Sequence, residues 1–146
     1  MIELQLGLIA DSAQIDSGGK LFILGEFRYI FASQVPATHQ SMALIMRLVA
    51  PSVEVQNKKC SLRLQFVDED GHDLFPKNPP ELPLQFGPIG PAERAVWQAQ
   101  VILNLGLLPL PKYGRYVIHV WVNEQRVGEM GFFVTKPPAA QPGQPG

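Results

Sequence analysis

The sequence has one cysteine, no long apolar run and almost no net charge, and each shortage excludes a class of protein. Because Cys60 has no second cysteine to pair with, an intramolecular disulfide framework is excluded. The most apolar stretch, 101–110, is interrupted by Asn104, Gly106 and Pro109, whereas a membrane-spanning helix needs roughly 18 apolar residues in a row. A formal net charge of -1 offers no general attraction to phosphate groups, so we expect neither nucleic acid nor a membrane as partner.

The first residues also lack the features of a secretory signal. The stretch 1–6 has neither a basic start nor an apolar segment of roughly 7 to 15 residues before a cleavage site. A lone cysteine is compatible with a reducing compartment. We therefore expect a soluble cytoplasmic protein.

Proline and glycine, in contrast, are abundant, with 14 and 13 residues. They are spaced too closely for several helices of ordinary length, and the segments between them favour a period of two. A length of 146 residues with 46% hydrophobic and 17% charged residues fits one globular domain. We predict an all-β, single-domain antiparallel β-sandwich over 1–136, immunoglobulin-like or jelly-roll-like, with about eight or nine strands. Residues 137–146 have no hydrophobic group large enough to offset the entropy of ordering, which predicts a flexible tail rich in Pro, Gly, Gln and Ala.

Alternation of apolar and polar side chains predicts where the strands lie. The expected strands are 2–8, 20–31, 41–49, 59–67, 72–75, 97–105, 113–123 and 126–136, with a short edge strand around 82–86 inside the proline-rich segment 76–91. The segment 92–105 also has a helical alternative, but its apolar residues match the period of two more fully. In the first strand, Leu4 and Leu8 are expected on the same covered face.

Three of these segments carry information about packing. Residues 41–49 are apolar on both faces, which indicates a central strand or one covered on its second side by another chain. Residues 59–67 are apolar on one face only, which favours an outer position. Gly25 interrupts 20–31 and indicates a bulge or a close crossing.

The last two strands, 113–123 and 126–136, predict an antiparallel hairpin because a short polar turn separates them. Tyr116 lies near the start of the first of these strands. In immunoglobulin-like sandwiches a tyrosine at this place ties down a corner through its hydroxyl group. Tyr116 therefore favours that class of sandwich.

The acidic run Asp68–Asp73 is the densest group of possible metal ligands in the chain. Sandwich domains can bind calcium with aspartates in loops, but Asp70-Gly71 is also a favoured tight-turn pair. The run lacks the spacing and the terminal Glu of a helix-loop-helix calcium site. We therefore prefer a structural turn and predict no metal.

The remaining reactive residues do not form a recognisable catalytic group. His39, His72 and His119 are far apart in sequence, and none has metal-ligand spacing to another histidine or to Cys60. Cys60 alternates in phase with apolar neighbours, which favours core packing over a nucleophile. Gly18 and Gly19 precede a strand and not a helix, so a phosphate cradle is not indicated. We predict no catalytic residue and no cofactor.

A mixed aromatic and polar surface is the one remaining candidate for a binding face. It would form if Trp121, His119, Arg28 and either Gln98 or Gln100 lay on outer faces of the sheets, and it would suit a protein or a carbohydrate. The competing explanation is that a loop such as 76–91 covers the same side chains, and we rank it slightly higher.

Four groups of residues together resemble a family of small bacterial proteins of unknown function. They are Leu8-Ile9-Ala10-Asp11, the segment from Gly19 to Gly25, the loop Pro36-Ala37-Thr38-His39 before 42–48, and Gly114-Arg115-Tyr116 with Val127-Gly128-Glu129. The resemblance covers nearly the whole of 1–136, and its motifs consist of turns and strand patterns. It implies a β-sandwich without an assigned activity, substrate or catalytic residue.

These observations predict a non-enzymatic interaction or self-association module that binds a protein partner or a second copy through a sheet face or an open edge. The alternative is a sandwich that binds carbohydrate or calcium, with Trp121 or the Asp68–Asp73 loop as the site. A hydrolase is a third and weaker option, because it needs a histidine and an orienting group beside Cys60 or a serine.

Overall fold

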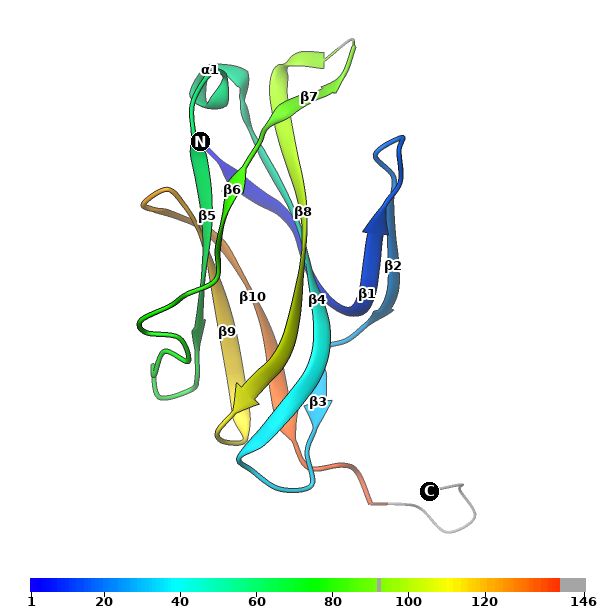
Figure 1. Ribbon diagram of the computed structural model, residues 1–146, viewed down its shortest axis with the longest axis vertical. Coiled ribbons are helices and arrows are strands. Elements are labelled where there is room, and N and C mark those ends of the chain that lie inside the picture. The colour runs from blue at the N-terminus through cyan, green and yellow to red at the C-terminus, as the bar shows by residue number, and fades with distance from the viewer. Residues whose placement is uncertain (92, 140–146) are drawn as a thin grey trace.

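The computed structural model describes residues 1–91 and 93–139, and the strands within them form two sheets (Figure 1). The elements are β1 (Glu3–Ile15), β2 (Leu21–Glu26), β3 (Tyr29–Phe31), β4 (Ala37–Pro51), α1 (Ser52–Val55), β5 (Cys60–Val67), β6 (Glu81–Leu84), β7 (Gly87–Gly90), β8 (Glu93–Leu110), β9 (Gly114–Val122) and β10 (Gln125–Thr135). The all-β prediction is confirmed, although the described residues contain ten strands and not eight or nine. Ala92 and residues 140–146, most of the predicted tail, lie outside the described residues.

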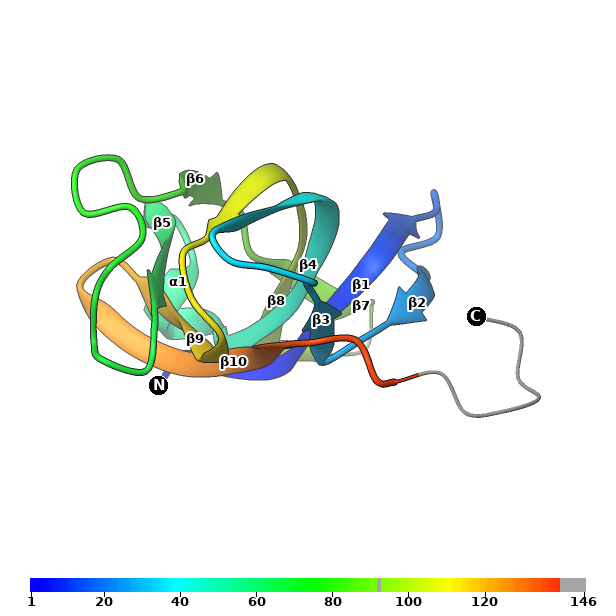
Figure 2. The same ribbon diagram turned by 90° about the horizontal axis from the view of Figure 1, so that it is seen from below.

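The two sheets have five strands each, in the orders β2-β1-β4-β8-β7 and β3-β10-β9-β5-β6. All neighbouring strands are antiparallel except β10 and β3, which run parallel. Figure 2 shows β1 and β2 extending to one side of the molecule, away from β5 and β6. The edge strands are therefore β2 and β7 in one sheet and β3 and β6 in the other.

One apolar core contains side chains from both sheets. Its fully buried members include Met42, Leu44, Met46 and Leu48 of β4, Leu62, Leu64 and Phe66 of β5, and Tyr116, Ile118 and Val120 of β9. Full burial of each large apolar side chain contributes roughly 1.5 to 3 kcal/mol. The single apolar face predicted for 59–67 is confirmed, since Cys60, Leu62, Leu64 and Phe66 are buried. β5 lies one place from the edge of its sheet, because β6 pairs with it on the outside.

The first strand departs from the predicted alternation. The pairing of β1 with β4 shifts by one residue between Leu4 and Leu6, which marks a β-bulge. A single extra residue reverses the faces of all residues after it. Leu4 therefore packs against the shared core, whereas Leu8 packs on the opposite face of the sheet. The expectation that Leu4 and Leu8 share a face is wrong.

The predicted strand 20–31 is two strands that belong to different sheets. β2 ends at Glu26, and β3 begins at Tyr29 in the other sheet. Gly25 has φ +73°, and a Cβ added there would lie 2.4 Å from a carboxylate oxygen of Asp11. Gly25 thus lies close to the paired strand β1 and not at a crossing of strands, and its positive φ permits the turn that precedes the change of sheet.

The position of β4 within its sheet explains why both of its faces are apolar. It lies between β1 and β8, so the prediction of a central strand is confirmed. Its outward residues Ala43 and Ile45 are completely buried in a second, smaller cluster that includes Ala13 and Leu21. These last two residues belong to the β1–β2 hairpin, which folds back over the outer face of its own sheet. The chain itself supplies the cover.

The region after β5 agrees with the sequence in part. The strand β8 includes 97–105, so the preferred strand is confirmed there and the helical alternative is wrong. β6 is the edge strand expected near 82–86. β7 and the single helical turn α1 were not anticipated. The strand predicted over 72–75 is reduced to one bridge between Val67 and Asp73.

Tyr116 makes the contact predicted for it. Its hydroxyl group donates to the carbonyl oxygen of Lys112 at 2.7 Å and accepts a weaker bond from the Lys112 N–H at 3.2 Å. The ring is buried and stacks on Phe132 at 5.2 Å between centroids. Tyr116 therefore ties the loop between β8 and β9 to the core.

We expect Tyr116→Phe to lower the free energy of unfolding by about 1 to 3 kcal/mol, because the substitution leaves the Lys112 backbone groups without their partner. Urea unfolding followed by fluorescence measures the change. Tyr29→Phe is the matched control, since Tyr29 is exposed and its loss of a hydroxyl group should change the value by less than about 0.5 kcal/mol. Equal effects of the two substitutions would contradict a role for the corner.

Candidate functional site

Large exposed apolar side chains gather on the β1–β2 hairpin. Leu24 is 70% exposed and Phe22 49%, and Ile15 and Ile23 are also exposed. Pairing of β1 with β4 stops at Ala10, so residues 12–15 of β1 form ladder pairs only with β2 among the described strands. Figure 1 shows this hairpin projecting beside the rest of its sheet.

The turn at the tip of the hairpin sets which backbone groups remain free. The Asp16 carboxylate accepts bonds from the N–H groups of Gly18 at 2.8 Å and Lys20 at 2.9 Å, and Gly19 has φ +84°. The Asp16 N–H donates to the Lys20 carbonyl oxygen at 2.9 Å. Hydrogen-bonded pairs alternate along an antiparallel ladder, so the peptide groups of Leu21 and Ile23 point to the outer edge of β2.

The two faces of β2 differ in surroundings. Leu21 packs with Ala13 toward Ile45 on the outer face of the sheet. Side chains two residues apart share a face, so Phe22 and Leu24 point away from that cluster. Their exposure agrees with this arrangement. We use the name hairpin edge for the outer edge of β2, Leu21–Glu26, with the flanking Lys20.

Further exposed aromatic residues follow the hairpin edge along the chain. Tyr29 of β3 stacks on Phe133 of β10 at 5.7 Å between centroids, and Phe31 is exposed beside them. Between β2 and β3, the Arg28 guanidinium lies 3.5 Å from the Glu26 carboxylate. Exposed apolar groups rimmed by charged residues are typical of interaction surfaces.

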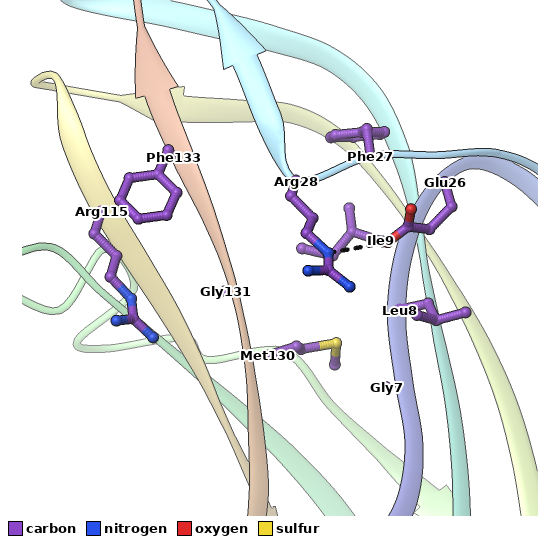
Figure 3. A pocket seen from close by; sticks show the side chains of 10 residues that line it. All are labelled: Gly7, Leu8, Ile9, Glu26, Phe27, Arg28, Arg115, Met130, Gly131 and Phe133. Atoms are coloured by element: carbon purple, nitrogen blue, oxygen red, sulfur yellow. Dashed lines mark ion pairs between the residues drawn. The ribbon is translucent and has the colours of Figure 1, made fainter.

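A pocket of about 360 Å³ lies next to this segment, between β1 and β10 (Figure 3). Its lining consists of Gly7, Leu8, Ile9, Glu26, Phe27, Arg28, Arg115, Met130, Gly131 and Phe133. None of these residues is a serine, cysteine or histidine, and the lining contains one carboxylate, that of Glu26, with two guanidinium groups, those of Arg28 and Arg115.

The acidic run forms a clamp between two loops. One oxygen of the buried Asp68 carboxylate accepts bonds at 2.9 Å from the N–H groups of Asp70 and His72. The ammonium group of Lys112 lies 3.4 Å from the other oxygen and also bonds Asp70. Asp68, Asp70 and His72 have ligand atoms within 4.8 Å of one another, and the Lys112 cation pairs with both carboxylates. The geometry agrees with the predicted structural turn.

The charges of the clamp shift both partners toward their ionised forms. Burial acts to raise the pKa of Asp68, but the hydrogen bonds from His72 and Asp70 and the nearby Lys112 cation outweigh it and leave that pKa below its ordinary value. The hydrogen bond to Asp70 is the main cause of the raised pKa of Lys112.

The histidines and the cysteine lie in separate surroundings. His39 of β4 is near the Phe27 ring, and its Nε2 atom is buried without a hydrogen-bond partner among the described residues, a feature that the sequence did not signal. His72 is 3.4 Å from Asp68, and His119 is 3.4 Å from Glu129. Cys60 faces the core, as its alternation predicted.

The predicted aromatic and polar surface does not exist as one face. Trp121 and His119 lie on β9, whereas Gln98 and Gln100 lie on β8 in the other sheet. The Arg63 guanidinium covers the Trp121 ring at 4.9 Å from its centroid, so a neighbouring strand and not the 76–91 loop provides this contact.

Gln100 is also engaged within the chain. It accepts two bonds from Arg47, at 3.0 and 2.9 Å, and donates to the Gly19 carbonyl oxygen at 3.0 Å. The last bond joins the tip of the hairpin to β8.

The sequence signal for the hairpin edge was the run Leu21–Leu24, which is apolar on both faces. The same signal was interpreted for 41–49.

Comparison with known proteins gives a family without an activity. A model described as a family of unknown function (DUF6941) matches residues 5–135. A search of curated proteins finds no match in sequence. Among solved structures, the Pseudomonas fluorescens alkylpurine DNA glycosylase AlkC bound to DNA containing an abasic site analog is similar with a TM-score of 0.47 and 14% identity, over 92% of this chain. The chain spans 30% of the length of that protein.

We expect Asp68→Asn to lower the free energy of unfolding at pH 7, with an effect that disappears in acid. Because the folded-state pKa of Asp68 is lowered, its contribution is complete above the unfolded-state pKa of about 3.9 and is lost as the pH falls through the folded-state value. Urea unfolding at pH 7 and near pH 2.5 measures the difference between the variant and the natural chain. Glu124→Gln, a change of an exposed acid in the β9–β10 turn, is the matched control. A difference for Asp68→Asn that is equal at both pH values would contradict the ionic clamp.

Proposed function

The chain belongs to the family of unknown function DUF6941, and from this premise we propose that it is a non-enzymatic interaction module that binds a protein chain through the hairpin edge. The observation that carries the proposal is an edge strand, paired on one side only, with large apolar side chains in solvent. An edge strand of this kind offers free N–H and C=O groups to another strand, and the side chains add apolar contact.

The other three edges have features that prevent pairing. β6 contains Pro83 and β7 contains Pro88, and proline cannot donate a ladder hydrogen bond. β3 has only three residues. Natural sheets commonly protect their edges by such prolines and by short strands. β2 has six residues, no proline and no charged side chain between Leu21 and Gly25, so it lacks these protections.

The fold that we infer is an antiparallel β-sandwich of the immunoglobulin-like type. One core shared by two sheets supports it, as does the Tyr116 hydroxyl bond to Lys112 near the start of the penultimate strand. We keep a jelly-roll-like arrangement as the alternative. A single free cysteine, buried in the core, supports a cytoplasmic location.

Ligand binding is the weaker alternative for reasons of geometry. Lys112 provides the positive charge that a calcium ion would bring to Asp68 and Asp70. Arg63 covers the aromatic ring that a sugar would stack on. A hydrolase has less support, because the described histidines lie on separate elements and Cys60 faces the core.

We expect Leu24→Lys to weaken binding at least about tenfold while leaving the monomer as stable as the natural chain, since exposed substitutions change stability by less than about 0.5 kcal/mol. Leu107→Lys is the matched control, because Leu107 on β8 is 68% exposed and lies away from the hairpin. Sedimentation velocity over a range of concentrations measures self-association, and affinity capture from the native host followed by binding measurements on the recovered protein measures other partners. Natural chain, Leu24→Lys and Leu107→Lys behaving alike in both assays would overturn the proposal.

A further inference from the structure

We propose that the pocket between β1 and β10 binds a small organic acid, with the carboxylate of the acid on the Arg115 guanidinium group and its apolar part against Phe133 and Met130. The volume of about 360 Å³ fits a small molecule, since ligand pockets start at roughly 300 Å³. This ligand is additional to the protein partner proposed for the hairpin edge, which the pocket adjoins at Glu26.

The charges of the pocket favour an anion. Its lining carries two guanidinium groups and one carboxylate, a net charge of +1, whereas the whole chain has a formal net charge of -1. Nε of Arg28 lies 3.5 Å from the Glu26 carboxylate, so these two charges offset each other. The Arg115 guanidinium group has no hydrogen bond or ion pair to any residue in 1–91 or 93–139. One positive charge is therefore left without compensation in the pocket.

The backbone around Arg115 explains the position of this charge. The Glu69 carboxylate accepts the main-chain N–H of Arg115 at 3.0 Å and does not pair with its guanidinium group. The side chain extends instead toward β10, where a Cβ added to Gly131 would lie 3.8 Å from Nε and 3.9 Å from Nη2 of Arg115. Figure 3 shows the ends of Arg115 and Arg28 on opposite sides of β10, with Gly131 between them. The missing side chain of Gly131 thus leaves room for the guanidinium group beside the pocket.

The edge of β10 adds a main-chain donor at the same place. The N–H group of Phe133 donates to the Arg28 carbonyl oxygen at 2.8 Å, so it points to the edge of β10 that faces β3. Peptide groups two residues apart on a strand point to the same edge, which directs the Gly131 N–H there as well. Pairing of β10 with β3 begins at Phe133 and does not use this N–H group. A carboxylate at Gly131 therefore meets a guanidinium group and a main-chain N–H, two donors that bind it strongly.

Apolar side chains form the rest of the walls. Phe133 is 42% exposed and is held in place by its stack on Tyr29. The other apolar members of the lining are Leu8, Ile9, Phe27 and Met130. A pocket with mainly apolar walls and a few polar groups that fix orientation is typical of small-molecule sites. The ligand is therefore expected to combine an apolar body with its anionic group.

The anionic group is a carboxylate because one guanidinium group is uncompensated. A carboxylate and a guanidinium group are both planar and form two parallel hydrogen bonds, which matches one charge with one charge. A phosphate monoester carries about -1.5 to -2 at pH 7, so part of its charge would stay uncompensated in a pocket that also contains the Glu26 carboxylate. Repulsion by Glu26 therefore disfavours the phosphate.

Titration of the isotope-labelled chain with 3-phenylpropionate tests the ligand class. Amide shifts of Gly131 and Phe133 in nuclear magnetic resonance spectra measure binding, and a ligand of this size should have a dissociation constant of roughly millimolar order. The neutral analogue 3-phenylpropanamide and the more highly charged phenyl phosphate are the comparison ligands. We expect both to bind at least about fivefold more weakly than 3-phenylpropionate, and we expect 0.5 M NaCl to weaken the binding of the carboxylate.

Substitutions test the residues. Arg115→Gln should raise the dissociation constant for 3-phenylpropionate at least about fivefold, and Arg115→Lys should have a smaller effect because it keeps the charge but not the paired donors. Arg126→Gln is the matched control, since it removes the same charge from an exposed arginine at the other end of β10 and should change the constant less than about twofold. Glu26→Gln should tighten binding by about two- to fivefold, because it removes the negative charge. The amide spectrum of each variant checks that the fold is retained.

The outcomes either support or overturn the site. Saturable shifts at Gly131 and Phe133 that prefer the carboxylate, are lost in Arg115→Gln and are kept in Arg126→Gln support it. Absence of saturable shifts up to about 50 mM 3-phenylpropionate overturns it. Equal binding of the amide, tighter binding of phenyl phosphate, or equal effects of Arg115→Gln and Arg126→Gln also overturn it. None of these results bears on the protein partner of the hairpin edge, which the Leu24→Lys experiment tests separately.

Discussion

The apolar core shared by the two sheets is the constraint on which the rest of the structure depends. Successive side chains of a strand point to opposite faces. A strand therefore keeps its apolar residues in the core only as long as no extra residue interrupts this alternation. The register shifts once in β1, after Leu4, and once in β10, before Gly128. The two places meet, because a Cβ added to Gly128 would lie 2.7 Å from Cβ of Leu4. Both irregularities therefore belong to one close crossing between the sheets.

Strands with one covered face were predictable from the sequence, whereas crossings and edges were not. β5 and β9 alternate cleanly because each faces the core on one side, and Tyr116 carried a local signal for its corner. The bulge in β1 and the change of sheet between β2 and β3 depend on contacts with distant strands. The alternation of apolar and polar residues continues across such breaks, so the sequence predicted one strand where the structure has β2 and β3.

The candidate sites divide in the same way. The turn at Asp68 was recognisable from its own residues, but Lys112, the cation that closes the clamp, lies 44 residues later and only the fold brings it there. Gln100 and the tip of the hairpin are likewise joined across 81 residues. The hairpin edge was visible as apolar residues on both faces of Leu21–Leu24, but its openness follows from where the pairing of β1 with β4 stops. Sequence alone does not determine where a ladder ends.

One face of the hairpin covers Ala43 and Ile45, while its outer edge pairs with no other strand among the described residues. A two-stranded ribbon is only marginally stable by itself, so the contact with its own sheet and any contact with a partner strengthen the same element. Binding at the outer edge and local ordering of the hairpin are then thermodynamically linked. A partner that binds the ordered hairpin also lowers the population in which the small cluster beneath it is exposed. A partner bound at the outer edge would therefore raise the apparent stability of this corner in proportion to the logarithm of its concentration.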